Sequence, residues 1–459
     1  MKDVDLFEYA LSYPCIKHPL ENMQQDFKVK YMALLEYYAH KYCKNSLIGY
    51  ERLFKFRNNF LCGIDENSIT FNADKFANSV LRMRFKPFHL YSFRLVFLFD
   101  CLFLFAPFND TLGNEICESL KPFVFKHYYN QMKLMVKKMY GNDANFIDTD
   151  TLITQKMINS WNNVQAFQRT RNCNILFTAT ISAGKSTLIN SLIGEELSFA
   201  KQAACTSTII KFISTPIYNP YFHIIYNSQH MCNVDAKSVR SFTKKCENPC
   251  EIIGYFDSYL CKNKVTLIDT PGVNSVIHTA HKSLTRIELE KNKAEIIVYV
   301  ISVENYGAED DFIHLKFILD NIDYKNIIFV INMMDTCDLE DDSIEEIVNN
   351  ISEHLIKIGF KEPIVCPLSA RAGMLIKKLL CGHKLSDNNY DECSAFIVKY
   401  LNPKMSLKGY YPQISEEDIM VNKSFDSNKY DLTAIKSAFT NTGLPGFELL
   451  LLQIIKGAC

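Results

Sequence analysis

The stretch Asn174–Gly194, NILFTATISAGKSTLINSLIG, decides the fold of this chain. An apolar run at 175–177 leads into a loop of small residues that ends in GKST at 184–187, and an amphipathic segment follows at 188–193. This order predicts a strand, a phosphate-binding loop and a helix, and it fits GxxxxGK[ST] except that Ala179 replaces the first glycine. A methyl group is tolerated there if φ is negative. We therefore expect a nucleotide-binding loop, and a glycine turn with a solvated lysine is the alternative.

The residue types of this loop suit a phosphate chain. Successive backbone N–H groups and the N-terminus of the following helix would point at one anion. Lys185 adds a positive charge for the β- and γ-phosphates, and the Ser186 hydroxyl is a candidate ligand of Mg²⁺. The residues that we predict to bind the nucleotide in this segment are Ala179, Ser182, Ala183, Gly184, Lys185, Ser186 and Thr187.

Composition sets bounds on the class of protein. The chain has 459 residues, which is long for one hydrophobic core, so two or more domains are expected. Its formal net charge of -1 gives no overall field that attracts nucleic acid, and no nucleic-acid partner is predicted. The 16 cysteines show no paired metal-binding spacing, and no secretory signal pattern begins the chain. Free thiols in a reducing compartment are the simplest interpretation, so we expect a cytoplasmic protein.

The pattern of apolar residues changes near residue 170. In 1–165 it has helical spacing at 26–44, 116–140 and 152–167, which predicts an α-helical domain. In 166–459 short apolar runs alternate with helical stretches, which predicts an α/β domain with a mostly parallel, doubly wound sheet. The pattern does not place the insert at about 374–440. The predicted strands are 175–177, 209–213, 222–226, 265–268, 296–301, 327–331 and 364–367, and the predicted helices are 310–321, 343–358 and 446–456.

One segment of the predicted helical domain, Leu90–Phe108, has the apolar content of a membrane span. Arg94 and Asp100 interrupt it, and its apolar runs are shorter than the roughly 20 residues that a spanning helix needs. We predict a buried helix, with a membrane-touching or partner-binding surface as the alternative. A small set of lysines forms either a solvated face or a peripheral contact with anionic lipid: Lys126, Lys133, Lys137 and Lys138.

A second motif is the segment VTLIDTPG at 265–272, a predicted strand followed by an acidic turn. At the end of that strand, Asp269 can hold a water on Mg²⁺ beside the phosphate loop. The N–H of Gly272 can contact the γ-phosphate, and a small residue permits that approach. An ordinary turn would also use this sequence. Its position downstream of a phosphate loop favours the functional interpretation.

Two further motifs bear on the base. Asn332 and Asp335 follow a predicted strand and match [NT]KxD, in which the aspartate accepts hydrogen bonds from guanine, except that Met333 replaces the lysine. Methionine supplies the apolar contact of a lysine stem without its charge. The sequence SAR at 369–371 matches a loop whose backbone supports guanine O6. The residues predicted to hold the base are Asn332, Asp335, Ser369, Ala370 and Arg371, and a plain strand-end turn is the alternative at the first two.

The segment ACTST at 204–208 precedes a predicted strand and is the candidate sensor of the γ-phosphate. A threonine there can bind Mg²⁺ through its hydroxyl and position water through its backbone. Thr206 is the first choice and Thr208 the alternative. The predicted metal ligands are therefore Ser186, Thr206 and Asp269, and the predicted cofactors are GTP or GDP with Mg²⁺.

Together these motifs resemble the large GTPases of the dynamin superfamily, especially the bacterial dynamin-like proteins. The most specific match is SAGKST at 182–187 followed by LINSLIG at 188–194, and the segments 341–346 and 443–447 are also similar to the bacterial group. The resemblance covers about 165–459. It implies a P-loop GTPase domain that hydrolyses GTP to GDP and phosphate. A nucleotide-dependent binding module with little hydrolysis, a membrane-remodelling protein and an ATPase are the alternatives.

The resemblance also implies roles and partners. Ser182 would neutralise charge between the β- and γ-phosphates, and Thr206 would orient the attacking water, so that Ser182, Lys185, Thr206 and Gly272 form the predicted catalytic set. Dimerisation across the nucleotide face would order both residues. Ile181 departs from the family, because a glutamine that helps to hold the water usually stands there. No long helical stalk is recognised after the GTPase domain. We therefore expect a shortened member that acts through self-association or with a companion dynamin-like protein.

Overall fold

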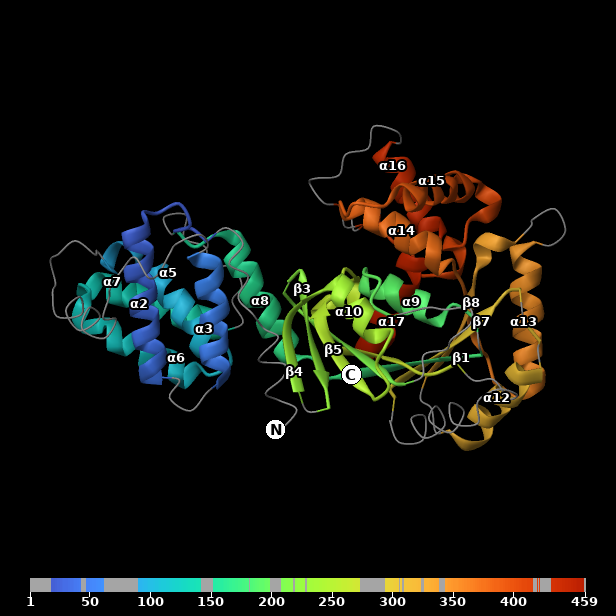
Figure 1. Cartoon of the computed structure of the whole chain (residues 1–459), viewed down its shortest axis with the longest axis horizontal. Coiled ribbons are helices and arrows are strands. Elements are labelled where there is room, and N and C mark those ends of the chain that lie inside the picture. Colours follow the sequence, from blue (N-terminus) through green and yellow to red (C-terminus); the bar gives the residue numbers. More distant parts are fainter. Residues whose placement is uncertain are drawn as a thin grey trace. The chain divides into compact units, whose positions relative to one another are not determined.

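The computed structural model of the chain is shown in Figure 1. It describes residues 18–42, 47–61, 90–141, 152–180, 182–198, 208–217, 219–227, 229–272, 294–304, 306–307, 309–322, 326–337, 343–415, 419, 421 and 431–457. The chain divides into two compact units. One comprises Met1–Thr170 with Thr215–Asn219, and the other comprises Arg171–Ser214 with Pro220–Cys459.

The first unit is built from helices. Its central helix, α5 (Leu90–Phe105), contacts α2 (Gln25–Tyr42), α3 (Leu47–Phe60), α6 (Asp110–Leu120) and α7 (Lys126–Tyr140). The last helix of the unit is α8 (Gln155–Arg169), whose Trp161 donates to the carbonyl oxygen of Met139 at 2.8 Å. The prediction of one helix over 116–140 is wrong. The chain is interrupted by the short 3-10 turn η2 (Lys121–Phe123), because Pro122 has no N–H to continue the hydrogen bonds of an α-helix.

Helix α5 confirms the prediction of a buried helix in the segment Leu90–Phe108, although the helix ends at Phe105. Its residues 96–104 are buried in the core of the first unit. Asp100 is tolerated there because His18 Nε2 lies 3.1 Å and Tyr31 OH 2.6 Å from its Oδ2. Arg94 donates to Gln131 at 2.9 Å and stacks on the ring of Tyr128. No helix in the described part of the chain is long and apolar enough to cross a membrane.

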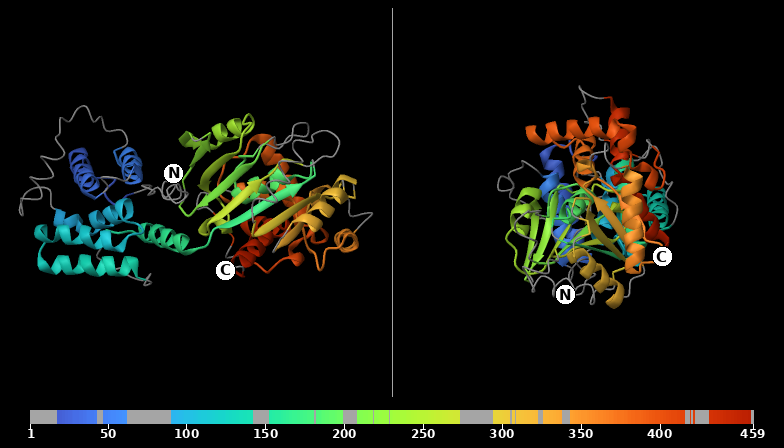
Figure 2. Two further views of the ribbon diagram at one scale, coloured as in Figure 1. Left: turned by 90° about the horizontal axis from the view of Figure 1, so that it is seen from below. Right: turned by 90° about the vertical axis from the view of Figure 1, so that its right-hand side faces the viewer.

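The second unit contains a single mixed, mostly parallel sheet. In the described ranges its strand order is β4-β3-β5-β2-β6-β1-β7-β8-β9. The strands are β1 (Cys173–Ala179), β2 (Ile210–Thr215), β3 (Tyr221–Tyr226), β4 (Gln229–Asp235), β5 (Cys250–Tyr255), β6 (Val265–Asp269), β7 (Ile296–Ser302), β8 (Ile327–Asn332) and β9 (Ile364–Pro367). Pairing is parallel from β6 through β1, β7 and β8 to β9, whereas β2 runs antiparallel to β6, and β3 antiparallel to β4 and β5. The strands twist across the sheet, as Figure 2 shows.

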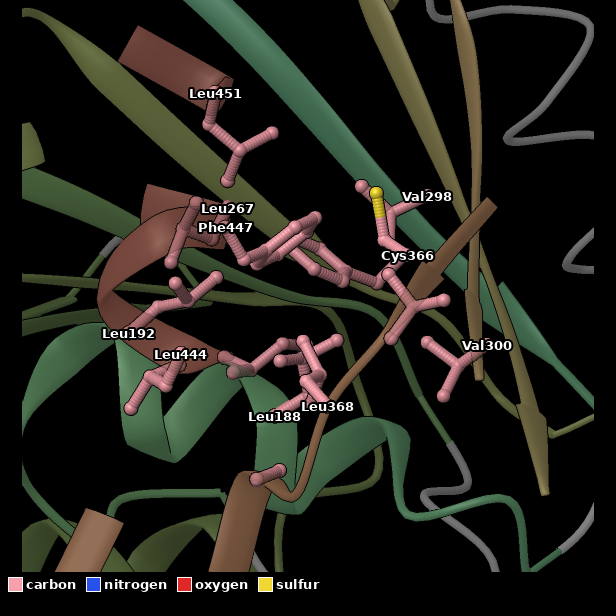
Figure 3. Packing of buried hydrophobic residues seen from close by; sticks show 14 of the residues in the cluster. Leu188, Leu192, Leu267, Val298, Val300, Cys366, Leu368, Leu444, Phe447 and Leu451 are labelled. Atoms are coloured by element: carbon pink, nitrogen blue, oxygen red, sulfur yellow. The ribbon is translucent and has the colours of Figure 1, made fainter. Parts of the chain in front are cut away.

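Helices cover both faces of this sheet, as the doubly wound prediction requires. The described helices of this unit are α9 (Lys185–Ile193), α10 (Ala236–Thr243), α12 (Glu309–Asn321), α13 (Ile344–Ile358), α14 (Ala370–Leu380), α15 (Asp387–Leu401), α16 (Leu432–Asn441) and α17 (Leu444–Gly457). On β7, Val298 and Val300 pack with residues of α9 and α17 (Figure 3). The ring of Tyr299, between them in sequence, lies 5.6 Å from the ring of His314 on α12. Alternate residues of one strand therefore face different helical layers.

Three helices occupy the region that the sequence pattern left unplaced. They are α14, α15 and α16, which pack on one another, and α14 also contacts α9. Figure 1 shows this group, in orange and red, beside the end of α9. Short 3-10 turns η5 (Pro403–Met405) and η6 (Lys408–Tyr410) connect α15 with the chain that leads to α16. These three helices place further side chains beside the loops that follow the parallel strands, for example Lys399 of α15.

Candidate functional site

The loop after β1 turns sharply at two residues with left-handed backbone. Ser182 is exposed and has a φ of 66°, and Gly184 has a φ of 78°. Gly184 directly precedes α9, and no side chain caps that end of the helix. The first N–H groups of a helix have no partner within it, so they suit an anion. Ala179, which replaces the expected glycine, is buried at the end of β1, where a methyl group meets no backbone restriction.

A buried carboxylate gathers the polar side chains of the loop. Asp269 ends β6, whose register places it beside Phe177 of β1, and its side chain is fully buried. The Lys185 ammonium forms an ion pair with Asp269 Oδ1. Ser186 Oγ donates to Oδ2 of the same carboxylate at 3.2 Å. Ser198 Oγ donates to that Oδ2 at 2.6 Å. Three donors from α9 and the segment after it therefore hold one carboxylate.

The oxygen donors of this cluster fit a magnesium ion. Ser186 Oγ and the Asp269 carboxylate are hard donors within 3.2 Å of each other, and both residues are buried. Mg²⁺ usually takes one or two protein oxygens and completes its shell with water and substrate phosphate. Within the described ranges, no group of three or more His, Cys, Asp or Glu residues could hold a metal ion. A site of two protein ligands that a phosphate chain completes is the arrangement that these residues fit.

Asn332 connects the phosphate loop with the loop after β9. Its Nδ2 donates to the carbonyl oxygen of Ala183 at 3.1 Å, and to that of Gly184 at 3.4 Å. Its Oδ1 accepts from the N–H of Ala370 at 3.0 Å. A Cβ at Gly184 would lie 2.3 Å from Asn332 Nδ2. Only glycine leaves room for this bridge at that point of the loop.

Met333 lies beside the same glycine. Its backbone is left-handed, with a φ of 66°, and a Cβ at Gly184 would lie 3.2 Å from its methyl carbon. Its sulfur accepts a weak hydrogen bond from Ser302 Oγ at 3.5 Å. The thioether therefore lies against the phosphate loop at Gly184.

Asp335 is held by two neighbouring elements. It lies in the 3-10 turn η4 (Met334–Thr336) that follows β8, and its Oδ1 accepts a hydrogen bond from Ser369 Oγ. Lys399, on α15, donates to the carbonyl oxygen of Asp335 at 2.6 Å. Because β8 and β9 are parallel neighbours, their carboxyl ends place Asp335 beside the loop at 369–371. An ionised carboxylate is an acceptor for which adjacent N–H groups of a ring are suitable donors.

The side chain of Arg371 is engaged by two residues of α15. Its Nε and Nη2 donate to the Glu392 carboxylate at 3.0 and 2.6 Å, and Nη2 also donates to Asn389 at 2.9 Å. The hydrogen bonds to Glu392 raise the pKa of the Arg371 guanidinium. The guanidinium of Arg371 is therefore already engaged by Glu392 and Asn389.

A polar cluster supports the phosphate loop from the side of α12. Thr180 Oγ1 donates to Asp311 Oδ1 at 2.9 Å, and Tyr299 OH donates to the same oxygen at 3.0 Å. Thr178 Oγ1 lies 2.8 Å from His314 Nε2. Sequence reasoning missed Asp311, His314, Ser198 and Lys399. The only signal in the sequence was that these polar residues stand within otherwise apolar helices or next to a motif. Such a signal does not indicate which residue each of them contacts.

The structure brings together most of the residues predicted for the site. Lys185, Ser186 and Asp269 meet at one end, and Asn332, Asp335 and Ser369 meet at the other. Thr187 follows in the first turn of α9, and Gly272 lies three residues beyond the end of β6. Thr206 and Ile181 lie outside the described residues. Thr208, the alternative to Thr206, is described and buried just before β2.

Part of the chain matches the model of a known protein family. Residues 175–334 match the model described as "Dynamin family". An uncharacterised protein from the xynA 3' region of Caldicellulosiruptor sp. (strain Rt8B.4) is 30% identical over 200 residues, which cover 42% of this chain and 47% of that protein. Elongation factor 1-alpha 2 of Euplotes crassus is 29% identical over 137 residues, 28% of either chain. The chain thus spans less than half the length of either relative.

Among solved structures, the chain is similar to two chains described under an oligomerised bacterial dynamin pair that provides a mechanism for the long-range sensing and tethering of membranes. One has a TM-score of 0.37 at 13% identity and covers 86% of this chain and 59% of that chain. The other has a TM-score of 0.37 at 14% identity and covers 87% and 71%. A single-residue variant of Era from Aquifex aeolicus, bound to GDP.AlF4-, gives a TM-score of 0.27 at 17% identity and covers 54% and 61%.

Proposed function

We propose that this chain, whose residues 175–334 match the dynamin-family model, is a dynamin-like GTPase that binds guanine nucleotide and hydrolyses GTP to GDP and phosphate. The observation that carries the proposal is the bridge made by Asn332. One side chain joins the phosphate loop at Ala183 to the loop after β9 at Ala370. Residues suited to phosphate and residues suited to a base are therefore held in fixed relation by one amide.

At the phosphate end, Lys185 and Ser186 are the residues that meet the nucleotide. In the structure both residues contact Asp269. Each must therefore turn toward phosphate or metal when nucleotide binds. Magnesium, when bound, neutralises charge on the β- and γ-phosphates. Ser182 and Gly272 lie in loops adjoining this end, and with Thr206 they are proposed to position the attacking water and neutralise developing charge. Such catalysis depends on positioning, without a covalent intermediate.

At the base end, Asp335 is proposed to select guanine by accepting hydrogen bonds from N1 and N2. Ser369 and Lys399 fix the carboxylate and the backbone of this residue, which supports a rigid acceptor. The backbone of Ala370 and Arg371 would support O6. An adenine ring presents the opposite donor and acceptor pattern at this edge, so GTP should be preferred to ATP.

Calorimetric titration of the full chain with GDP in the presence of Mg²⁺ tests the proposal. We expect Lys185→Ala to remove measurable binding and Asp335→Asn to shift preference from guanine toward xanthine nucleotides. Lys404→Ala, at an exposed lysine of η5, is the control and should bind like wild type. Unchanged GDP affinity in Lys185→Ala would refute the site assignment.

A nucleotide-binding module with slow hydrolysis is the competing function within the same class. Ile181 and Met333, which replace a polar residue and a lysine of the family pattern, favour it. Single-turnover phosphate release at several protein concentrations separates the two. A rate that rises with concentration supports hydrolysis activated by self-association or by a companion protein. Release that stays slow at every concentration supports the binding module.

Peripheral contact with anionic membranes is a second candidate function, and it is favoured by the surface of α7. Phe125 and Leu134 are 60% and 52% exposed, next to the exposed Lys126 and Lys137. Co-sedimentation with phosphatidylserine vesicles should be reduced in the double variant Lys126→Glu, Lys137→Glu and unchanged in Lys404→Glu. Absence of vesicle binding by the wild-type chain would remove this function.

A further inference from the structure

We propose that Ser198 is a positioning residue of the metal site, whose hydroxyl keeps the Asp269 carboxylate oriented toward Mg²⁺ after Lys185 and Ser186 have turned to the nucleotide. The inference rests on the proposed guanine-nucleotide binding and names a residue outside every motif in the sequence. Ser198 lies shortly after the end of α9, in the turn that follows Gly194.

The contact between Ser198 and Asp269 is short and excluded from solvent. Ser198 Oγ lies 2.6 Å from Asp269 Oδ2, within the range of hydroxyl–carboxylate hydrogen bonds with a charged acceptor. Ser198 is 2% exposed and Asp269 is 0% exposed. Water therefore does not replace this donor without a change in the surrounding structure.

Asn190 fixes the backbone from which this hydroxyl projects. Its Oδ1 accepts from the N–H groups of Leu197 at 3.0 Å and Ser198 at 2.8 Å. Its Nδ2 donates to the carbonyl oxygen of Ser198 at 2.8 Å. Asn190 belongs to α9, the helix whose first residues are Lys185 and Ser186. The same helix therefore presents the phosphate ligands and sets the position of the third donor to Asp269.

Nucleotide binding changes the balance of donors around this carboxylate. Lys185 and Ser186 are suited to the phosphates and the metal, and both contact Asp269 in the described state. When they turn away, Asp269 keeps its negative charge in a buried place, where an unsatisfied acceptor is costly. Of the three residues that donate to Asp269, Ser198 is the one that is not predicted to bind the nucleotide or the metal. It can hold Oδ2 while the carboxylate faces the hydrated metal.

If the Ser198 hydroxyl is merely structural, its removal lowers only the stability of the protein. If it positions Asp269, its removal weakens Mg²⁺ binding even when the nucleotide site is fully occupied. We therefore titrate Mg²⁺ into the full chain saturated with a fluorescent GDP analogue, and measure the analogue's affinity separately in EDTA. For Ser198→Ala we expect roughly tenfold weaker Mg²⁺ affinity, the loss of one hydrogen bond to a charged group. The affinity for the analogue in EDTA should stay within about twofold.

Two further variants make the result specific. Ser191→Ala is the matched control, because Ser191 is a fully buried serine of α9 whose Oγ donates to Leu188 O instead of to Asp269. It should leave Mg²⁺ affinity unchanged. Ser198→Thr keeps the hydroxyl and should have the Mg²⁺ affinity of the wild type. Ser198→Cys has a weaker donor, so its Mg²⁺ affinity should lie between those of the wild type and Ser198→Ala.

The outcomes separate this inference from the function on which it rests. If wild type binds no guanine nucleotide, the proposed function fails. If wild type binds GDP with Mg²⁺ and Ser198→Ala has the same Mg²⁺ affinity, Ser198 has no positioning role. If Ser198→Ala does not fold, the comparison of Ser198→Cys with Ser198→Thr decides, and equal Mg²⁺ affinities would overturn the inference.

Discussion

Asn332 donates a hydrogen bond to the main-chain carbonyl oxygen of Ala183 at 3.1 Å, and through this contact the end of β8 holds the turn of the phosphate loop. The same amide accepts from Ala370 N at 3.0 Å. Its side chain is nearly fully buried. Two loops that follow different strands therefore depend on one residue for their relative position.

We expect Asn332→Ala to weaken GDP binding at least tenfold. The substitution leaves a buried N–H and buried carbonyl groups without their partner, at a cost of about 1–3 kcal/mol. Calorimetry with GDP measures the effect. Asn326→Ala is the control, because Asn326 precedes the other end of β8 and donates to Glu295 O at 3.4 Å. Equal affinities of Asn332→Ala and Asn326→Ala would show that the bridge does not order the site.

Gly184→Ala should destabilise the protein and impair nucleotide binding. Gly184 has a φ of 78°, and an added Cβ would lie 2.3 Å from Asn332 Nδ2, so both backbone and neighbour must move. We expect a loss of about 1–3 kcal/mol in unfolding free energy, measured by urea denaturation. Gly409→Ala is matched to it, since a Cβ there meets no atom within 4 Å. A near-neutral Gly184→Ala would contradict the tight packing of this loop.

Strong periodicity and phosphate-loop chemistry made much of the sheet predictable. The all-apolar runs of β7 and β8 are typical of strands that are covered on both faces, and each predicted strand is present. The strands β4 and β5 were not predicted. β4 is largely polar, lies at the sheet edge and has only β3 as a neighbour in the described sheet, so burial places little constraint on its sequence.

Site residues could be predicted only where they stand at a fixed position in a short sequence motif or at the end of a recognisable strand. Lys185 and Ser186 follow Gly184 directly, and Asp269 ends a recognisable strand. Ser198 could not be found in this way, because its partner lies 71 positions away and the contact depends on Asn190 holding a turn. Lys399 comes from α15, in the region whose pattern predicted no element. Long-range contacts of this kind follow from the fold and not from local sequence.

The buried pair of Lys377 and Glu448 offers a test of how α17 is attached. Lys377 Nζ lies 2.6 Å from Glu448 Oε1 and 2.9 Å from the carbonyl oxygen of Ser191, so one ammonium joins α14, α17 and α9. Burial raises the pKa of Glu448. Lys377→Met should cost about 3–5 kcal/mol of unfolding free energy, because it leaves a carboxylate buried and unpaired.

Replacing both partners should cost much less. In Lys377→Met, Glu448→Leu no buried charge remains, and exchange of a buried ion pair for apolar side chains is often near neutral. Urea denaturation of the wild type, both single variants and the double variant gives the coupling free energy. Additive single effects would mean that the two groups do not interact across α14 and α17.

His383 should give stability a measurable pH dependence. Its Nε2 lies 3.2 Å from Asp257 Oδ2 and its Nδ1 lies 3.4 Å from Glu195 Oε1. The hydrogen bond to Asp257 raises the pKa of His383 above its ordinary value of 6.5. Because the folded state binds the proton more tightly, the stabilisation is complete below the unfolded pKa and is lost as pH rises through the raised folded pKa. The imidazolium pair contributes up to about 1 kcal/mol.

Urea denaturation of wild type and His383→Gln at about pH 6 and about pH 8.5 measures this effect, in the range around and above the ordinary histidine pKa. The variant should be less stable than wild type at the lower pH, and the difference should shrink at the higher pH as wild-type His383 loses its proton. His230→Gln, at an exposed residue of β4, controls for the loss of a histidine as such. A difference that is equal at both pH values, or larger at the alkaline one, would show that the charged imidazole does not stabilise the contact with Asp257.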